Sequence, residues 1–169
     1  MGYDVVVREW NPRRMIEYQQ IEEIEARGTG WDSDRLEQTV LDKDCWVLTA
    51  AETANNSIVG YIAFLIRPRH VRIANVGVYP TWRGVGVGRA LVESVVDSYR
   101  QMQHGVIVVV DERQLAAQQF FRACRFWWTD SVYDVDEDAD QYIMRWRAKP
   151  PVVRPRCANR ITQHMGEIS

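Results

Sequence analysis

The pattern of apolar and polar positions along the chain predicts alternating strands and helices. Runs of β-branched and aromatic residues are typical of strands, whereas apolar residues three or four positions apart are typical of helices. The predicted strands are residues 3–8, 45–50, 58–66, 71–79, 106–110, 126–133 and 142–146. The predicted helices begin after Asn11, after Asp32 or Ser33, near Val87 and at Gln114. Their order, β-α-α-β-β-β-α-β-α-β-β, predicts an α/β (α+β mixed sheet) domain with helices on both faces of the sheet.

Two segments carry more specific expectations. Residues Val106–Val110 are apolar throughout, so we expect this strand to be buried on both faces. After Lys149 the chain contains prolines and arginines without any apolar period. We therefore expect a domain of residues 1–148 followed by a disordered tail of residues 149–169.

Composition narrows the class of protein. The chain has 169 residues and a net charge of −2, which favours one domain and argues against a nucleic-acid partner. Its three cysteines are far apart and form no CxxC pair, so we expect no metal site, no disulfide framework and a cytoplasmic location. No apolar run approaches the ~20 residues of a membrane helix, so we expect no membrane partner. A monomer and a dimer both remain open.

The sharpest local feature is the glycine-rich segment from Arg83 to Arg89, placed between a predicted strand and a predicted helix. Unpaired N–H groups at a helix N-terminus bind anions, and glycines let a phosphate approach the backbone closely. The segment fits neither the dinucleotide fingerprint nor the P-loop, because no third glycine and no Lys-Ser or Lys-Thr stands at the required place. What remains is the pattern R-x-x-G-x-G, formed by Arg83, Gly86 and Gly88.

With this motif the chain resembles the GNAT acetyltransferases, which bind acetyl-coenzyme A through it. The lead-in from Asn75 to Pro80 and the segment from Ala116 to Phe126 are also similar to that family. Within it, the chain resembles most the ribosomal-protein alanine N-acetyltransferase (RimI-like) group. The resemblance implies a GNAT fold and acetyl-coenzyme A as co-substrate. It implies these coenzyme contacts: Val76, Gly77, Val78, Arg83, Gly84, Val85, Gly86, Val87, Gly88, Arg89, Gln114 and Phe121.

The chain departs from the family at the positions that carry protons. Phe121 stands where a tyrosine is the proposed acid, and Val109 stands where a glutamate or histidine is the proposed base. At pH 7 it costs about 4.6 kcal/mol to deprotonate a lysine ε-amine but only about 1.4 kcal/mol for an α-amine. An enzyme without a strong base is thus better matched to a peptide or protein N-terminus.

Candidate acceptor-side residues are fewer. Trp31, Tyr79 and Tyr133 are candidate acceptor contacts, and Tyr133 is the catalytic candidate for donating or relaying a proton. The alternative is that Trp31 simply packs and that the two tyrosine hydroxyls lie in water. The acidic segment 134–140 either attracts a cationic amine or is simply a solvated turn. Three functions follow: an N-terminal acetyltransferase, a small-molecule amine acetyltransferase, and an acyl-coenzyme A binding or sensing module without turnover.

Overall fold

The computed structural model describes residues 4–10, 15–27 and 33–149, and the element order within them is the predicted one. The strands are β1 (Val5–Glu9), β2 (Cys45–Glu52), β3 (Ile58–Ile66), β4 (Val71–Val78), β5 (Val106–Asp111), β6 (Phe126–Asp134) and β7 (Ala139–Trp146). The helices are α1 (Met15–Ala26), α2 (Ser33–Val40), α3 (Val87–Tyr99) and α4 (Leu115–Ala123), with a 3-10 turn at Pro80–Trp82. The expected cap at Asn11 and the tail from residue 150 lie outside the described residues.

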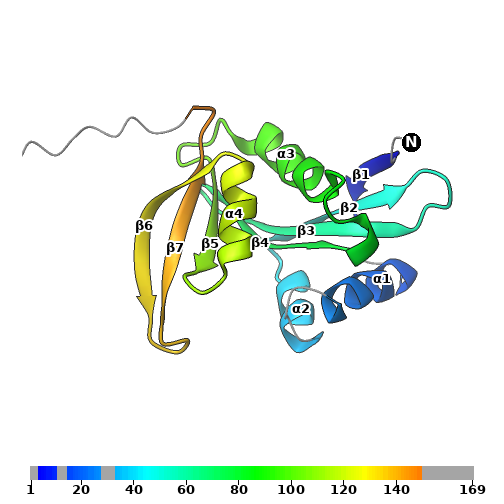
Figure 1. Cartoon of the computed structure of the whole chain (residues 1–169), viewed down its shortest axis with the longest axis horizontal. Coiled ribbons are helices and arrows are strands. Elements are labelled where there is room, and N and C mark those ends of the chain that lie inside the picture. Colours follow the sequence, from blue (N-terminus) through cyan, green and yellow to red (C-terminus); the bar gives the residue numbers. More distant parts are fainter. Residues whose placement is uncertain (1–3, 11–14, 28–32, 150–169) are drawn as a thin grey trace, which may run out of the picture.

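The strands form one mixed sheet of order β1-β2-β3-β4-β5-β7-β6. Neighbouring strands are antiparallel except β4 and β5, which are parallel. Helices α3 and α4 lie on one side of the sheet, and α1 and α2 lie on the other (Figure 1). This is the mixed α/β sheet with helices on both faces that the element order predicts.

Two apolar clusters hold the layers together, one on each side of β3. Ile62 and Phe64 pack with the α3 side, whereas Tyr61 and Ala63 pack with the α1 side. This is the alternation that a central strand requires, and it explains why β3 is buried almost throughout. The apolar stripe of α3 closes the first cluster at helical spacing: Val87, Leu91, Val92, Val95 and Val96.

The expectation that β5 is buried on both faces is wrong. Val106, Val108 and Val110 are buried, but Val109 is 36% exposed. Helices cover only one face of β5 in the described part of the chain, so the other face opens onto a cavity. An unbroken apolar run hides this difference, because no alternation is visible when both faces carry β-branched apolar side chains.

β4 and β5 part after a short contact. Their parallel pairing joins only Val71–Ile73 to Val106–Val108. Just beyond it, β4 carries a bulge at Ala74: Ile73 pairs with Phe64 and Asn75 with Ala63, so Ala74 is the extra residue. A bulge bends its strand and increases the local twist. The remainder of β4 therefore has a free edge among the described residues, and a cavity lies along that edge.

Candidate active site

The N-terminus of α3 forms one end of the site. Gly84 and Gly86 adopt φ values of 77° and 98°, a left-handed conformation that glycine reaches without a steric penalty. The first N–H donated within the helix is that of Ala90, to the Gly86 carbonyl at 2.9 Å. The preceding N–H groups of residues 87–89 point out of the helix end, where they and the helix dipole favour an anion. This geometry fits the phosphates of a coenzyme.

The free edge of β4 forms the second part. The Tyr79 N–H donates to the Val59 carbonyl of β3 at 2.8 Å. Because the direction of backbone groups alternates along a strand, the N–H and C=O groups of Val76 and Val78 face away from β3, into the gap beside β5. In this structure the Val76 N–H donates to Asn75 Oδ1, and Arg83 Nε donates to the Val78 carbonyl, both at 2.9 Å.

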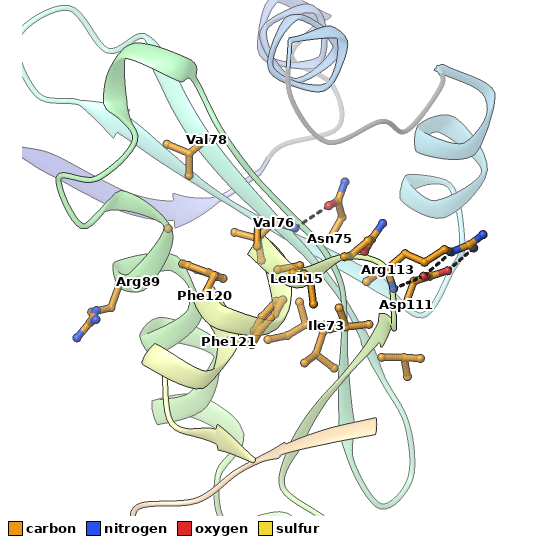
Figure 2. Close-up of a pocket in the computed structure, with 18 of the residues that line it drawn as sticks. Ile73, Asn75, Val76, Val78, Arg89, Asp111, Arg113, Leu115, Phe120 and Phe121 are labelled. Atoms are coloured by element: carbon orange, nitrogen blue, oxygen red, sulfur yellow. Dashed lines mark hydrogen bonds and ion pairs between the residues drawn. The ribbon is translucent and has the colours of Figure 1, made fainter. Parts of the chain in front are cut away.

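These parts line one cavity of about 1050 Å³ that runs from the glycine-rich loop along β4 to the β6–β7 hairpin (Figure 2). It brings together nine of the residues expected to contact the coenzyme: Val76, Val78, Arg83, Gly84, Gly86, Gly88, Arg89, Gln114 and Phe121. Gly77, Val85 and Val87 do not line it. Gly77 faces α1 instead, where a side chain would come within 2.9 Å of Glu25 Oε1 and Ile24 Cγ2.

Aromatic side chains of α4 form the apolar wall. Phe120 and Phe121 both line the cavity, and their rings meet edge to face with centroids 5.1 Å apart. Phe120 also closes over the start of α3, because a Cβ at Gly88 would lie 3.2 Å from its ring. Sequence reasoning missed Phe120, although its position beside Phe121 on the same helix was a usable signal.

The opposite end of the cavity is charged. Arg113 donates two hydrogen bonds to Asp111, from Nε to Oδ1 at 2.9 Å and from Nη2 to Oδ2 at 2.6 Å. These bonds hold the pKa of Asp111 well below its usual range, so this carboxylate is a poor proton acceptor. A second cavity of about 460 Å³ adjoins the first and shares Arg35, Val109 and Asp134 with it.

Of the residues at positions expected to transfer protons, some line the main cavity and some do not. Val109 and Phe121 both line the main cavity, and both side chains are apolar. Tyr133 lies on β6, is 56% exposed and donates its hydroxyl hydrogen to Asp138, outside the described lining of both cavities. That bond raises the pKa of Tyr133. Tyr79 also lies outside the lining, with Arg27 over its ring, and Trp31 lies outside the described residues.

A buried polar cluster behind β4 was not predicted. The Tyr61 hydroxyl donates to Glu25 Oε1, and Asn75 Nδ2 donates to Glu25 Oε1 at 3.1 Å and to the Tyr61 hydroxyl at 2.8 Å. Asn75 also lines the main cavity. Figure 2 shows Asn75 on the opposite side of β4 from Phe120 and Phe121. The sequence signal was Glu25 beside Ile24 and four residues after Ile21, on the buried face of α1.

Other site types find no support in the described residues. Within residues 4–10, 15–27 and 33–149 no group of three or more metal-ligating side chains gathers. None of the helices described there is long and apolar enough to cross a membrane. The free cysteines in this part of the chain are Cys45 and Cys124.

Comparisons with known proteins agree with the fold described above. The structure is similar to the ribosomal-protein-S18-alanine N-acetyltransferase from Escherichia coli, with a TM-score of 0.66 and 16% identity over 85% of this chain and 93% of that one. It is similar to NAA60 from Arabidopsis thaliana in complex with acetyl-CoA, with a TM-score of 0.67 and 17% identity over 85% and 99%. It is also similar to nourseothricin acetyltransferase, with a TM-score of 0.62 and 16% identity over 84% of this chain and 97% of that one.

These likenesses show the fold and do not separate the RimI-like group from other members. No curated protein matches the sequence significantly. The model of the Acetyltransferase (GNAT) family matches residues 7–126, most of the chain. The glycine-rich anion site, the free edge of β4 and this match together show that the chain belongs to the GNAT family and is an acetyl-coenzyme A-dependent acetyltransferase.

Proposed function

We propose that the protein transfers the acetyl group of acetyl-coenzyme A to the α-amine of a peptide or protein N-terminus. The observation that carries the proposal is the chemistry of the cavity lining. Val109 and Phe121 are apolar, and Asp111 is held by Arg113 with a lowered pKa. Such a lining favours an amine that loses its proton readily, and an α-amine does so at about 3 kcal/mol less cost than a lysine side chain.

In this proposal the coenzyme lies in the main cavity, with its phosphates at the end formed by the start of α3. Its phosphates bind the N–H groups at the start of α3, with Arg89 beside them. Its pantetheine arm follows the free edge of β4 as an added strand, using the backbone groups of Val76 and Val78. The Arg83 side chain then leaves the Val78 carbonyl, and its charge becomes available to the phosphates. The thioester lies near Val76, where a backbone N–H can polarise its carbonyl.

The acceptor enters from the other end, where Asp134 and Glu137 line the cavity. Their negative charge favours a cationic amine during encounter. The likeness to the ribosomal-protein-S18-alanine N-acetyltransferase supports an N-terminal acceptor. Nourseothricin acetyltransferase has a similar fold, so a small-molecule amine is the competing acceptor class.

A paired-peptide assay tests the proposal. One peptide has a free α-amine and no lysine, and its partner has a blocked N-terminus and a single lysine in the same context. Release of free coenzyme A thiol at pH 7 is expected to be at least tenfold faster with the first peptide. Equal or faster reaction of the lysine peptide contradicts the proposal. Reaction confined to polyamines or amino sugars contradicts it in favour of a small-molecule acceptor, and tight acetyl-coenzyme A binding without thiol release from any amine indicates a binding module.

A further inference from the structure

Glu25, Tyr61 and Asn75 form a polar cluster in an otherwise apolar layer between α1, β3 and β4. Glu25 is 4% exposed and Tyr61 is fully buried. Their neighbours Ile21, Ile24 and Ala63 are apolar. Burying a carboxylate without a cation is costly, and no ion pair of Glu25 with a described residue is formed. Burial raises the pKa of Glu25, while the bonds from Tyr61 and Asn75 oppose this effect.

The backbone makes room for the cluster. Gly77 lies directly against it, and a Cβ there would be 2.6 Å from Tyr61 Cε1 and 2.9 Å from Glu25 Oε1. The bulge at Ala74 directs Asn75 toward α1, so that its amide reaches Glu25 while the residue still lines the cavity. Among the described residues, Asn75 is therefore the member of the cluster that also lines the main cavity.

The hydrogen bonds fix which end of the Asn75 amide faces which partner. The Tyr61 hydroxyl gives its hydrogen to Glu25, so its oxygen can only accept from Asn75 Nδ2. Glu25 Oε1 also accepts from Nδ2. With Nδ2 held by two acceptors, Oδ1 is directed to the Val76 N–H at 2.9 Å. The amide cannot turn over without breaking both bonds of Nδ2.

The Val76 N–H is the group that the proposed function assigns to the thioester carbonyl. When that carbonyl takes the N–H, Asn75 Oδ1 loses its donor beside the cavity. An acceptor oxygen left without a donor is costly, and the amide is prevented from rotating to find another. An amine arriving at the thioester has N–H groups that can donate to this oxygen.

We propose that Asn75 binds the acceptor amine through Oδ1 once the thioester carbonyl has accepted the hydrogen bond of the Val76 N–H. Glu25 and Tyr61 are then positioning residues that hold the Asn75 amide in this orientation. The inference rests on the proposed coenzyme position but not on which amine is the acceptor. Binding of the acyl group and of the amine is thereby coupled. The transfer itself is unchanged: the amine nitrogen forms the C–N bond, the C–S bond breaks, and the amine proton ends on the coenzyme A thiol.

The test measures amine affinity in the presence of two unreactive ligands. One is coenzyme A, which lacks a carbonyl, and the other is a ketone analogue in which a methylene separates sulfur from the carbonyl. Amines from a panel of peptides, polyamines and amino sugars are titrated by calorimetry. For whichever amine binds, the ketone analogue is expected to increase the affinity about fivefold or more over coenzyme A, within the usual range of coupling.

Four variants, one of them a control, separate positioning from general stability. Asn75→Ala is expected to abolish the difference in amine affinity between the complexes with the two ligands, while leaving the affinity for coenzyme A itself unchanged. Glu25→Ala is expected to reduce it strongly, whereas Glu25→Gln is expected to keep most of it, because an amide oxygen still accepts from Tyr61 and Asn75. Glu17→Gln is the matched control, since Glu17 is another buried glutamate of α1, paired with Arg8 at 3.0 Å.

Three results overturn the inference. The first two are a coupling that survives in Asn75→Ala and a wild-type protein that binds amines equally with both ligands. Loss of coupling in Glu17→Gln to the same extent as in Glu25→Ala also overturns it. The identity of the amine that is acetylated decides the proposed function separately, so failure of an N-terminal acceptor leaves this test intact. Thermal unfolding of each variant shows whether a loss reflects misfolding.

Discussion

Gly86 allows a test of the anion site against a matched position elsewhere in the fold. Its φ is 98°, and nothing lies within 4 Å of the place a Cβ would occupy. Gly86→Ala therefore costs backbone strain alone, about 1–3 kcal/mol. Gly105, in the turn before β5, has φ 61° and also has open space, with its nearest neighbour Arg100 O at 3.9 Å. Gly105→Ala costs a similar amount, about 1–2 kcal/mol, far from the glycine-rich loop.

Stability and coenzyme affinity should therefore separate. Each variant is expected to lower Tm by about 2–4 °C per kcal/mol in scanning calorimetry. Only Gly86→Ala places a methyl group in the cavity at the start of α3, where it blocks close approach of a phosphate. Losing one charge-assisted hydrogen bond, worth about 1.5–3 kcal/mol, corresponds to at least about a tenfold rise in the Kd of acetyl-coenzyme A. An unchanged Kd in Gly86→Ala, or an equal rise in Gly105→Ala, would refute the placement of the phosphates.

Three further predictions address other parts of the site. Arg89→Gln is expected to weaken acetyl-coenzyme A binding about tenfold and to flatten its salt dependence, with no change for acetyl-pantetheine, which lacks the pyrophosphate; titration with both ligands checks this, and equal losses contradict it. Val109→Glu places a carboxylate in the cavity and is expected to raise the rate with lysine ε-amines at pH 7 by at least about tenfold relative to α-amines, since a positioned base contributes about 10²–10⁴; the paired peptides measure the ratio, and an unchanged ratio contradicts it. Burial raises the pKa of Glu25, so the wild type loses stability as the pH rises from about 4.5 through the folded pKa. Glu25→Gln lacks this loss and should be more stable than the wild type at pH 8 but not at pH 4. Urea unfolding measures the difference, and an equal difference at both pH values would count against the prediction.

Much of the fold follows from local patterns. The bounds of β3 match the apolar run Ile58–Ile66, and α3 follows its stripe from Val87. The glycine-rich loop was also predictable, because Gly84 and Gly86 stand where backbone conformations with positive φ are needed. These features depend on residues that are neighbours in sequence.

The acceptor side depends on residues far apart in sequence. The segment IEEIEA is typical of a solvated acidic helix, yet Glu25 lies on the face that also buries Ile21 and Ile24. Only the packing of α1 on β3 and β4 brings it to Tyr61 and Asn75, and no local pattern encodes that contact. The exposure of Val109 was hidden for a similar reason, since it depends on which face of β5 the helices leave uncovered.

The extra residue at Ala74 also sets a limit on insertions and deletions in this chain. Because side chains alternate along a strand, removing one residue there would exchange the two faces of everything that follows in β4. Val76 and Val78 would turn to the side of α1, and Gly77 would face the coenzyme cavity. The backbone N–H and C=O groups of Val76 and Val78, which now lie at the free edge, would turn toward β3 at the same time. The chain can therefore change length in the β6–β7 turn at residues 135–138 far more easily than in these few residues of β4.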